Sequence, residues 1–182
     1  SNGETVACDT LVMAIGQVPM IELADALGSA RTFDARRGGH VALGNEAISA
    51  VGACAGLADT GFDHAAYRFD WLNALGGACG GNTIICQCEE VTLSDLLGVQ
   101  PPNYLERSPA MQARSLKSLL ADGPPNQDQI KRLTRSGMGV CQGRRCRDQV
   151  AMMLAVEAGS ELSALPLATH RAPVRPLPLK II

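Results

Sequence analysis

Residues 86–92 read Cys-Gln-Cys-Glu-Glu-Val-Thr, and residues 131–146 read Lys-Arg-Leu-Thr-Arg-Ser-Gly-Met-Gly-Val-Cys-Gln-Gly-Arg-Arg-Cys. Four of the seven cysteines therefore lie in two tight pairs, one in each stretch. They are Cys86, Cys88, Cys141 and Cys146. Four thiolates in two short loops are a suitable ligand set for one tetrahedral-sulfur metal site, which holds either zinc or an iron–sulfur cluster.

Length, aromatic content and net charge exclude several classes of protein. A chain of 182 residues forms one domain or two small ones. It has one Trp, two Tyr and three Phe, too few for the base-stacking platforms that bind single-stranded nucleic acid. The net charge of −2 gives no general attraction to DNA or anionic lipid. No apolar run approaches the roughly 20 residues that a membrane span needs, so we expect neither a membrane nor a nucleic-acid partner.

The cysteines and the first residues also indicate the cellular compartment of the protein. Residues 1–4 lack the basic and apolar parts of a signal peptide, which favours a cytoplasmic location. In that reducing compartment, paired cysteines more often hold metal or perform redox chemistry than form structural disulfides. We expect the other three cysteines, Cys8, Cys54 and Cys79, to be small apolar residues without a role in the metal site.

Composition divides the chain into three parts. The run Gly-Gly-Ala-Cys-Gly-Gly over residues 76–81 predicts a linker, because glycine disfavours the interior of a helix or strand. We therefore predict a first segment over residues 1–78 and a second over 79–164. Four prolines follow in residues 165–182, which predicts an extended tail along the surface.

The first segment has the pattern of an α/β protein. Residues 11–15 predict a buried strand, and residues 20–27 predict a helix that ends at Gly28. Further elements are expected in this order: a hairpin turn at residues 36–39, a strand at residues 47–51, and a helix capped by Asp63 that ends near Gly76. This is too little material for a complete nucleotide-binding fold, and it is typical of the end of one.

The second segment is predicted to be all helical, which makes the whole chain α+β. Thr92 and Asp95 form a capping pair for a first short helix. Three further helices are expected over residues 113–121, 126–135 and 146–158, the last ended by Gly159.

Each cysteine pair precedes a predicted helix start, and the second lies in a basic run. Helix N-termini present free N–H groups and a positive dipole end, which stabilise negative charge on sulfur. Six basic residues and no acid occupy residues 131–147. A [2Fe–2S] cluster with four thiolates carries a charge of about −2 when oxidised. We predict that Arg144, Arg145 and Arg147 favour the reduced cluster and raise its potential.

Three other interpretations of the cysteines and their surroundings remain open. Zinc ribbons usually use pairs separated by two residues, a spacing that neither pair here has. Two disulfides would require a strained bridge between Cys86 and Cys88 if each pair closed on itself. The basic run is also compatible with a solvated face or a nucleic-acid-binding helix.

The two cysteine stretches, with their flanks, resemble the [2Fe–2S] domain related to bacterioferritin-associated ferredoxin. They are most similar to the version fused to the C-terminus of FAD-dependent oxidoreductase subunits. Those include the α-type subunits of opine oxidases, hydroxyproline and proline dehydrogenases, and hydrogen cyanide synthase. The resemblance covers residues 84–158 and implies that the four paired cysteines bind the cluster. The gap between the pairs is longer than in the compact family, which implies an insertion over about residues 99–127 that bulges outward without moving the ligands.

The first segment resembles pyridine-nucleotide-disulfide-oxidoreductase-like flavoproteins. Residues 9–19 are similar to a strand-to-turn motif in which a glycine, here Gly16, lets the backbone approach the dinucleotide. Residues 47–56 are similar to a later strand that ends in Gly-Asp, which places Gly52 beside the FAD. Ala53 occupies the position of that aspartate, so its hydrogen bond to the ribityl chain is missing. No Gly-x-Gly-x-x-Gly follows a predicted strand, so we expect FAD in a full-length parent and not on this chain alone.

The resemblance implies the electron-transfer segment of a flavin-dependent amine or amino-acid dehydrogenase or oxidase, of the opine or proline type. The implied partners are the N-terminal flavin-binding half of the same protein and a substrate-oxidising subunit. No catalytic residue is assigned to this chain, and Glu89 and Glu90 are interpreted as charges at a helix start or as partners for the arginines. The alternatives are a zinc-stabilised helical module that binds a partner through its basic face, and a stand-alone ferredoxin-like iron–sulfur protein.

Overall fold

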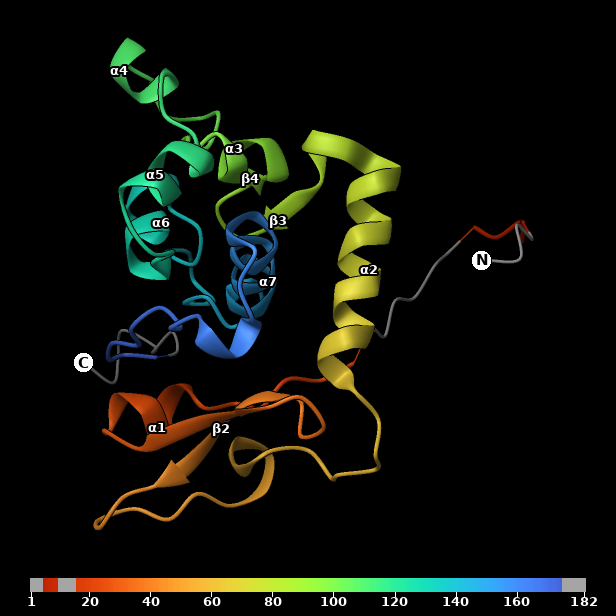
Figure 1. Cartoon of the computed structure of the whole chain (residues 1–182), viewed down its shortest axis with the longest axis vertical. Helices are drawn as coiled ribbons and strands as arrows, with labels where there is room; N and C mark the ends of the chain where they lie inside the picture. Colours follow the sequence, from red (N-terminus) through yellow and green to blue (C-terminus); the bar gives the residue numbers. More distant parts are fainter. Residues whose placement is uncertain (1–4, 10–15, 175–182) are drawn as a thin grey trace, which may run out of the picture.

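The structure, a computed structural model, describes residues 5–9 and 16–174 of the chain. Helix α1 (Glu22–Ala26) and the hairpin of β1 (Ala30–Asp34) and β2 (Gly39–Gly44) lie together below a group of helices that surrounds α7 (Arg147–Ala158) (Figure 1). The long helix α2 (His64–Cys79) runs beside that group. Helices are thus combined with small antiparallel sheets, so the α+β class is confirmed. None of the helices in these ranges is long and apolar enough to cross a membrane.

The predicted hairpin at residues 36–39 is confirmed. Strands β1 and β2 pair in antiparallel register, with Phe33 opposite His40. Asp34 accepts hydrogen bonds at Oδ1 from the N–H groups of Arg36 (3.0 Å) and Arg37 (3.1 Å), which closes the turn. Helix α1 is also found where predicted, and Gly28 follows it with a φ of 81°. The strand predicted at residues 11–15 lies outside the described residues apart from its end at Gly16.

The strand predicted at residues 47–51 is wrong. Asn45 accepts hydrogen bonds at Oδ1 from the N–H groups of Ala47 (2.9 Å) and Ile48 (3.0 Å). This side-chain turn uses the donors that a strand would have offered to a neighbour. A short 3₁₀ helix, η1 (Gly52–Ala55), follows instead.

Helix α2 begins as predicted and ends later than predicted. Asp63 accepts from the N–H of Ala66 at 2.8 Å, which confirms it as the N-cap. The linker expected over residues 76–81 is wrong over its first four residues, because residues 76–79 complete helix α2. The chain leaves the helix at Gly80, where φ is 60°, and continues into η2 (Gly80–Asn82). Gly76 and Gly77 thus continue α2 despite the low helix propensity of glycine.

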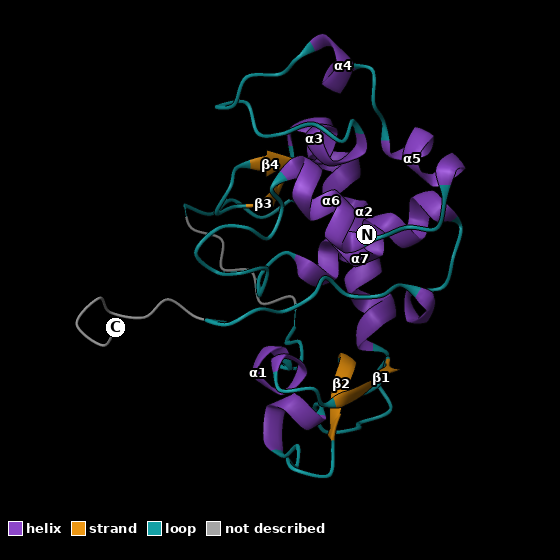
Figure 2. Ribbon diagram, turned by 90° about the vertical axis from the view of Figure 1, so that its left-hand side faces the viewer, coloured by secondary structure: helices purple, strands orange, loops and turns teal. Residues whose placement is uncertain are grey.

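The second segment is not all helical. Strands β3 (Ile84–Cys86) and β4 (Val91–Thr92) form a small antiparallel pair that places Cys86 opposite Val91 (Figure 2). The β-branched run before Cys86 suits this extended conformation. Helix α3 (Leu93–Leu97) follows with the predicted cap, in which Thr92 N–H donates to Asp95 at 3.0 Å and Asp95 N–H donates to Thr92 at 3.2 Å.

The 99–127 stretch bulges outward only in part. Its helix α4 (Pro109–Gln112) projects from the molecule in Figure 1, whereas α5 (Leu116–Asp122) packs against α3 and α7. The helix predicted over residues 113–121 begins later than expected, at Leu116, because Ser115 is its N-cap. Leu116 is only 2% exposed, so this stretch contributes to the core.

The last helices confirm their predicted caps. Asn126 accepts from the N–H groups of Asp128 and Gln129 and begins α6 (Gln127–Thr134). The helix ends one residue earlier than expected, at a left-handed Arg135 with φ of 63°. Helix α7 carries buried side chains from Val150 to Ala155 and forms the centre of the core. After η3 (Leu162–Ala164) the chain is extended over residues 165–174, with Leu165 and Leu167 buried.

We predict that Leu116→Ala lowers the free energy of unfolding by about 2–5 kcal/mol, because it leaves a cavity in the core. The matched control is Leu105→Ala in the same stretch, where the leucine is 39% exposed and the expected loss is well under half as large. Urea denaturation of both variants measures the difference. Equal small losses would mean that the whole stretch bulges away from the core.

A second prediction concerns acid stability. Burial lowers the pKa of His40 from its ordinary 6.5 to about 4, so the folded protein holds this imidazole neutral. As the pH falls below 6.5, the unfolded chain binds a proton at this group, whereas the folded protein does so only near pH 4. The free energy of unfolding is therefore unaffected above pH 6.5 and falls by up to about 3 kcal/mol as the pH approaches 4. Urea denaturation between pH 7 and pH 4 should show a steeper loss for the natural protein than for His40→Phe. An identical pH dependence in the two proteins would contradict the prediction.

Candidate functional site

The fold brings the four paired cysteines together. Cys86 ends β3, Cys88 lies in the turn before β4, Cys141 lies in the loop after α6, and Cys146 is the N-cap of α7. Cys146 lies close enough to Cys86 to lower its pKa, and the Cys141 thiol lies close enough to Cys88 to act to raise its pKa. Each contact joins one sulfur from each loop, so the two loops face one another across a common centre.

The two contacts differ in depth. Cys86 and Cys146 are 1% and 2% exposed and belong to the hydrophobic core. Cys141 is 8% exposed and Cys88 is half-buried, so this pair lies nearer the surface. Of the other cysteines, Cys8 is exposed and Cys54 is half-buried.

The inner pair stabilises a thiolate. The Cys146 thiol, followed by the N–H groups of Gly137, Glu89 and Cys88, lowers the pKa of Cys86 to about 6 despite burial. The Gly137 nitrogen lies 3.4 Å from Cys86 Sγ. The pKa of Cys146 is raised correspondingly, because its proton is held by Cys86 and its sulfur is buried. Donors directed at sulfur are what an anionic sulfur centre requires.

In the outer pair, Cys88 and Cys141, the pKa of Cys88 is shifted in the opposite direction. The N–H of Cys141 acts to lower the pKa of Cys88, but the hydrogen bond with the Cys141 thiol, burial and the neighbouring cysteines together raise it. The charges of the cysteines therefore influence one another across both loops.

Glycine permits the close approach of the loops. A Cβ on Gly139 would lie 2.4 Å from Cys88 Cβ and 3.2 Å from Glu89 Oε1, so no larger residue fits without movement. Gly137, two residues earlier, has a φ of 80°, which glycine adopts at little cost. The Gly-Met-Gly sequence before Cys141 thus has a direct structural reason.

The three predicted arginines have different surroundings. Arg144 Nε donates to the Cys141 carbonyl at 3.1 Å, and Arg145 donates to Gln87 at 3.2 Å, which links the two cysteine loops. Arg147 instead forms a buried ion pair with Glu22 at 3.1 Å and also contacts Asp148 at 3.3 Å. Two of the three charges therefore lie at the cysteine loops, and the third is paired with carboxylates.

Glu89 holds the first cysteine loop from the other side. Its carboxylate accepts from Arg135 Nε at 2.7 Å and from the Tyr104 hydroxyl at 2.5 Å. Burial acts to raise the pKa of Glu89, but these two donors outweigh it and the pKa is lowered. The interpretation of Glu89 as a partner for the arginines is confirmed. Tyr104 was missed, because a lone tyrosine in an expected insertion gives no signal in the sequence.

The two predicted cofactor glycines are separated. Gly16, with φ of 121°, borders a cavity of about 220 Å³ between α2, the start of α7 and the second cysteine loop. Trp71 and Arg68 from α2 and Arg144 from the loop also line this cavity. Gly52 begins η1 and is not part of it. With Arg145, which also lines it, the cavity places a tryptophan and three arginines around one volume beside the second cysteine loop.

Within residues 5–9 and 16–174, no group of three or more His, Cys, Asp or Glu side chains is arranged around one point as ligands of a single metal ion. The four thiols are instead in contact as two pairs.

Comparison with known proteins finds similarity in both sequence and fold. Residues 104–182 match the family described as the sarcosine oxidase A3 domain. Over 99 residues, or 53% of this chain, the sequence is 33% identical to an opine oxidase subunit of Agrobacterium tumefaciens (strain Ach5) and 31% identical to the corresponding one of Rhizobium meliloti. The alignments cover only 16% and 15% of those two proteins.

The fold is similar to the crystal structure of L-proline dehydrogenase from P. horikoshii. The TM-score is 0.53 at 20% sequence identity, and the match covers 92% of this chain and 37% of that one. At this identity the likeness establishes a shared fold for nearly the whole chain.

We predict that Gly139→Ala lowers the free energy of unfolding by about 1–3 kcal/mol, because its methyl group forces Cys88 away from the loop. Gly123→Ala is the matched control, since Gly123 has an extended φ of 172° and no atom near a Cβ, and it should change stability by less than about 1 kcal/mol. Urea denaturation compares the two. Equal effects would show that the loops tolerate a wider separation.

Proposed function

We propose that this chain is the electron-transfer segment of a flavin-dependent amine or amino-acid dehydrogenase or oxidase, and that Cys86, Cys88, Cys141 and Cys146 bind a [2Fe–2S] cluster. The proposal rests on the way in which two loops, distant in sequence, bring four cysteines together. Each cysteine of one loop lies next to a cysteine of the other loop.

The residues present fit such a cluster. Four thiolates are the usual ligand set of [2Fe–2S] centres. Two sulfurs bound to one tetrahedral metal at about 2.3 Å lie roughly 3.8 Å apart, close to the separation in a thiol–thiol hydrogen bond. Each cross-loop pair combines one sulfur of the first loop with one of the second, as two ligands of one iron would. The N–H of Gly137 supplies a hydrogen bond to sulfur, which favours negative charge there.

The chain's own residues would position and tune this centre. A bound [2Fe–2S] cluster supplies one-electron transfer. Gly139 allows the loops to close, and Arg145 joins them through Gln87. Arg144 and Arg145 place positive charge beside the outer cysteines, which favours the reduced form. The half-buried Cys88 brings one edge of the centre near the surface, where a partner can approach.

The flavin belongs to the longer protein in this proposal. The similar opine oxidase proteins are about six times as long as the aligned stretch, and their naming as subunits implies that each works with at least one other chain. We propose an N-terminal half that binds FAD, a substrate-oxidising partner subunit, and a cytoplasmic location. Ala53 lacks the carboxylate of the flavoprotein motif, so FAD must be held mainly by residues outside this chain.

The experiment is metal analysis of protein purified without oxygen. We expect brown protein with visible absorption and about two iron and two sulfide per chain. Serine in place of Cys86 or Cys146 should abolish the absorption, while Cys54→Ser, the control outside the centre, should leave it unchanged. Colourless protein with stoichiometric zinc would overturn the proposal and favour a zinc-stabilised binding module.

The sequence of the longer protein tests the flavin part separately. An upstream Gly-x-Gly-x-x-Gly after a strand, with FAD bound to the full-length protein, is expected. An iron–sulfur cluster in a parent without any flavin-binding half would instead indicate a stand-alone ferredoxin.

A further inference from the structure

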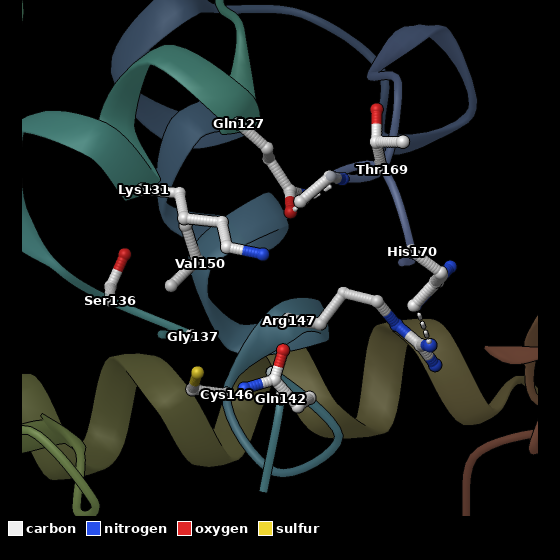
Figure 3. A pocket seen from close by; sticks show the side chains of 12 residues that line it. Gln127, Lys131, Ser136, Gly137, Gln142, Cys146, Arg147, Val150, Thr169 and His170 are labelled. Atoms are coloured by element: carbon white, nitrogen blue, oxygen red, sulfur yellow. Dashed lines mark hydrogen bonds between the residues drawn. The ribbon is translucent and has the colours of Figure 1, made fainter. Parts of the chain in front are cut away.

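A small pocket lies behind Cys146, on the side that faces away from the outer cysteines. Helix α6 lines it with Gln127 and Lys131, the first turn of α7 with Arg147, and the extended tail with residues 168–170 (Figure 3). Its volume is about 20 Å³, which is enough for one water-sized ligand. The pocket has no part in the proposed electron transfer.

Two buried donors at this pocket have no partner. Gln127 and Arg147 are each 4% exposed, and Gln127 Nε2 and Arg147 Nε make no hydrogen bond to any described residue. The orientation of the Gln127 amide is set by the Ala168 N–H, which donates to Oε1 at 3.3 Å and leaves Nε2 as the free group. Buried donors without acceptors are rare in folded proteins, so a ligand is needed to satisfy them.

A third donor extends into the same space. Figure 3 shows the Lys131 side chain directed from α6 toward the space beside Val150 and Arg147. The positive end of the 12-residue helix α7 also borders the pocket, because Cys146 and Arg147 both line it.

Among the residues that the structure describes, no carboxylate lines this pocket, and its other polar lining residues are Ser136, Gln142, Thr169 and His170. The nearby carboxylates are engaged elsewhere: Glu22 and Asp148 pair with the terminal nitrogens of Arg147, and Asp128 accepts from Thr169. The pocket therefore offers an amide, a guanidinium and an ammonium group to a ligand, with Cys146 as a weak acceptor on one side.

We propose that this pocket binds a small monovalent anion of the chloride type. An anion accepts from all three donors and has no hydrogens of its own to satisfy. A water molecule accepts only two hydrogen bonds, so it would leave the third of these donors without an acceptor. The volume suits a halide and is too small to enclose sulfate or phosphate.

Halide-dependent stability tests the proposal without any reference to iron or flavin. Sodium chloride replaces sodium gluconate at constant ionic strength, because gluconate is too large to enter. We expect a saturable rise in melting temperature for the natural protein, as mass action requires of a ligand that binds only the folded state.

Three variants identify the site. Lys131→Gln removes one charge and should weaken chloride binding by about tenfold, the effect of losing one interaction of roughly 1.4 kcal/mol. Gln127→Glu keeps the side-chain shape, replaces the donor by a carboxylate and should abolish the chloride effect. Lys117→Gln is the control, since Lys117 lies exposed on α5 and its loss should change nothing.

Crystals grown in sodium bromide provide the direct observation. An anomalous peak between Gln127, Lys131 and Arg147 is expected, whereas a water molecule there with no anomalous signal would overturn the proposal. A chloride response of Lys131→Gln equal to that of Lys117→Gln would overturn it as well. Neither result bears on the iron content, so this inference and the proposed function fail independently.

Discussion

The buried guanidinium group of Arg147 joins three parts of the chain that are far apart in sequence. Its side chain is 3% exposed and pairs with Glu22 of α1, which lies 125 residues away, while the same group contacts the Pro19 carbonyl and His170 of the tail. An unpaired charge at such a depth costs several kcal/mol. Helix α1, the first turn of α7 and the extended tail must therefore dock together, and the remaining elements are arranged around that contact.

The positions of the four paired cysteines depend on this contact. Arg147 directly follows Cys146, so fixing the first turn of α7 also fixes the innermost sulfur. Cys86 meets that sulfur from the end of β3, and the missing side chain of Gly139 lets Cys88 approach Cys141. On the opposite side of Cys146, the same docking encloses the pocket lined by Gln127 and Lys131. One set of packed loops thus carries both the proposed electron-transfer centre and the proposed anion site.

Local features were predictable where a side chain acts on its own backbone. The caps at Asp63, Thr92 and Asn126 and the turn after Asp34 depend on contacts within a few residues, and all are confirmed. The secondary-structure predictions are wrong where a segment distant in sequence or a competing turn determines the local conformation. Asn45 accepts from the N–H groups of residues 47 and 48 and holds them in a turn, and Gly76 continues helix α2 despite its low propensity. The strand that carries Cys86 exists only because residues 91–92 pair with it, which no helical period in the sequence could show.

The sequence by itself determined which residues would supply the proposed chemistry: four cysteines in two pairs, the glycines before Cys141 and the arginines that follow it. These are matters of residue type and spacing along one short stretch. Only the tertiary structure decided that the sulfurs meet across the loops, that Arg147 is committed to Glu22 while Arg144 and Arg145 stay at the loops, and that Gln127 and Arg147 leave two donors unsatisfied. The physical reason is that burial and charge pairing depend on which segments pack together, and the partners here are separated by tens of residues.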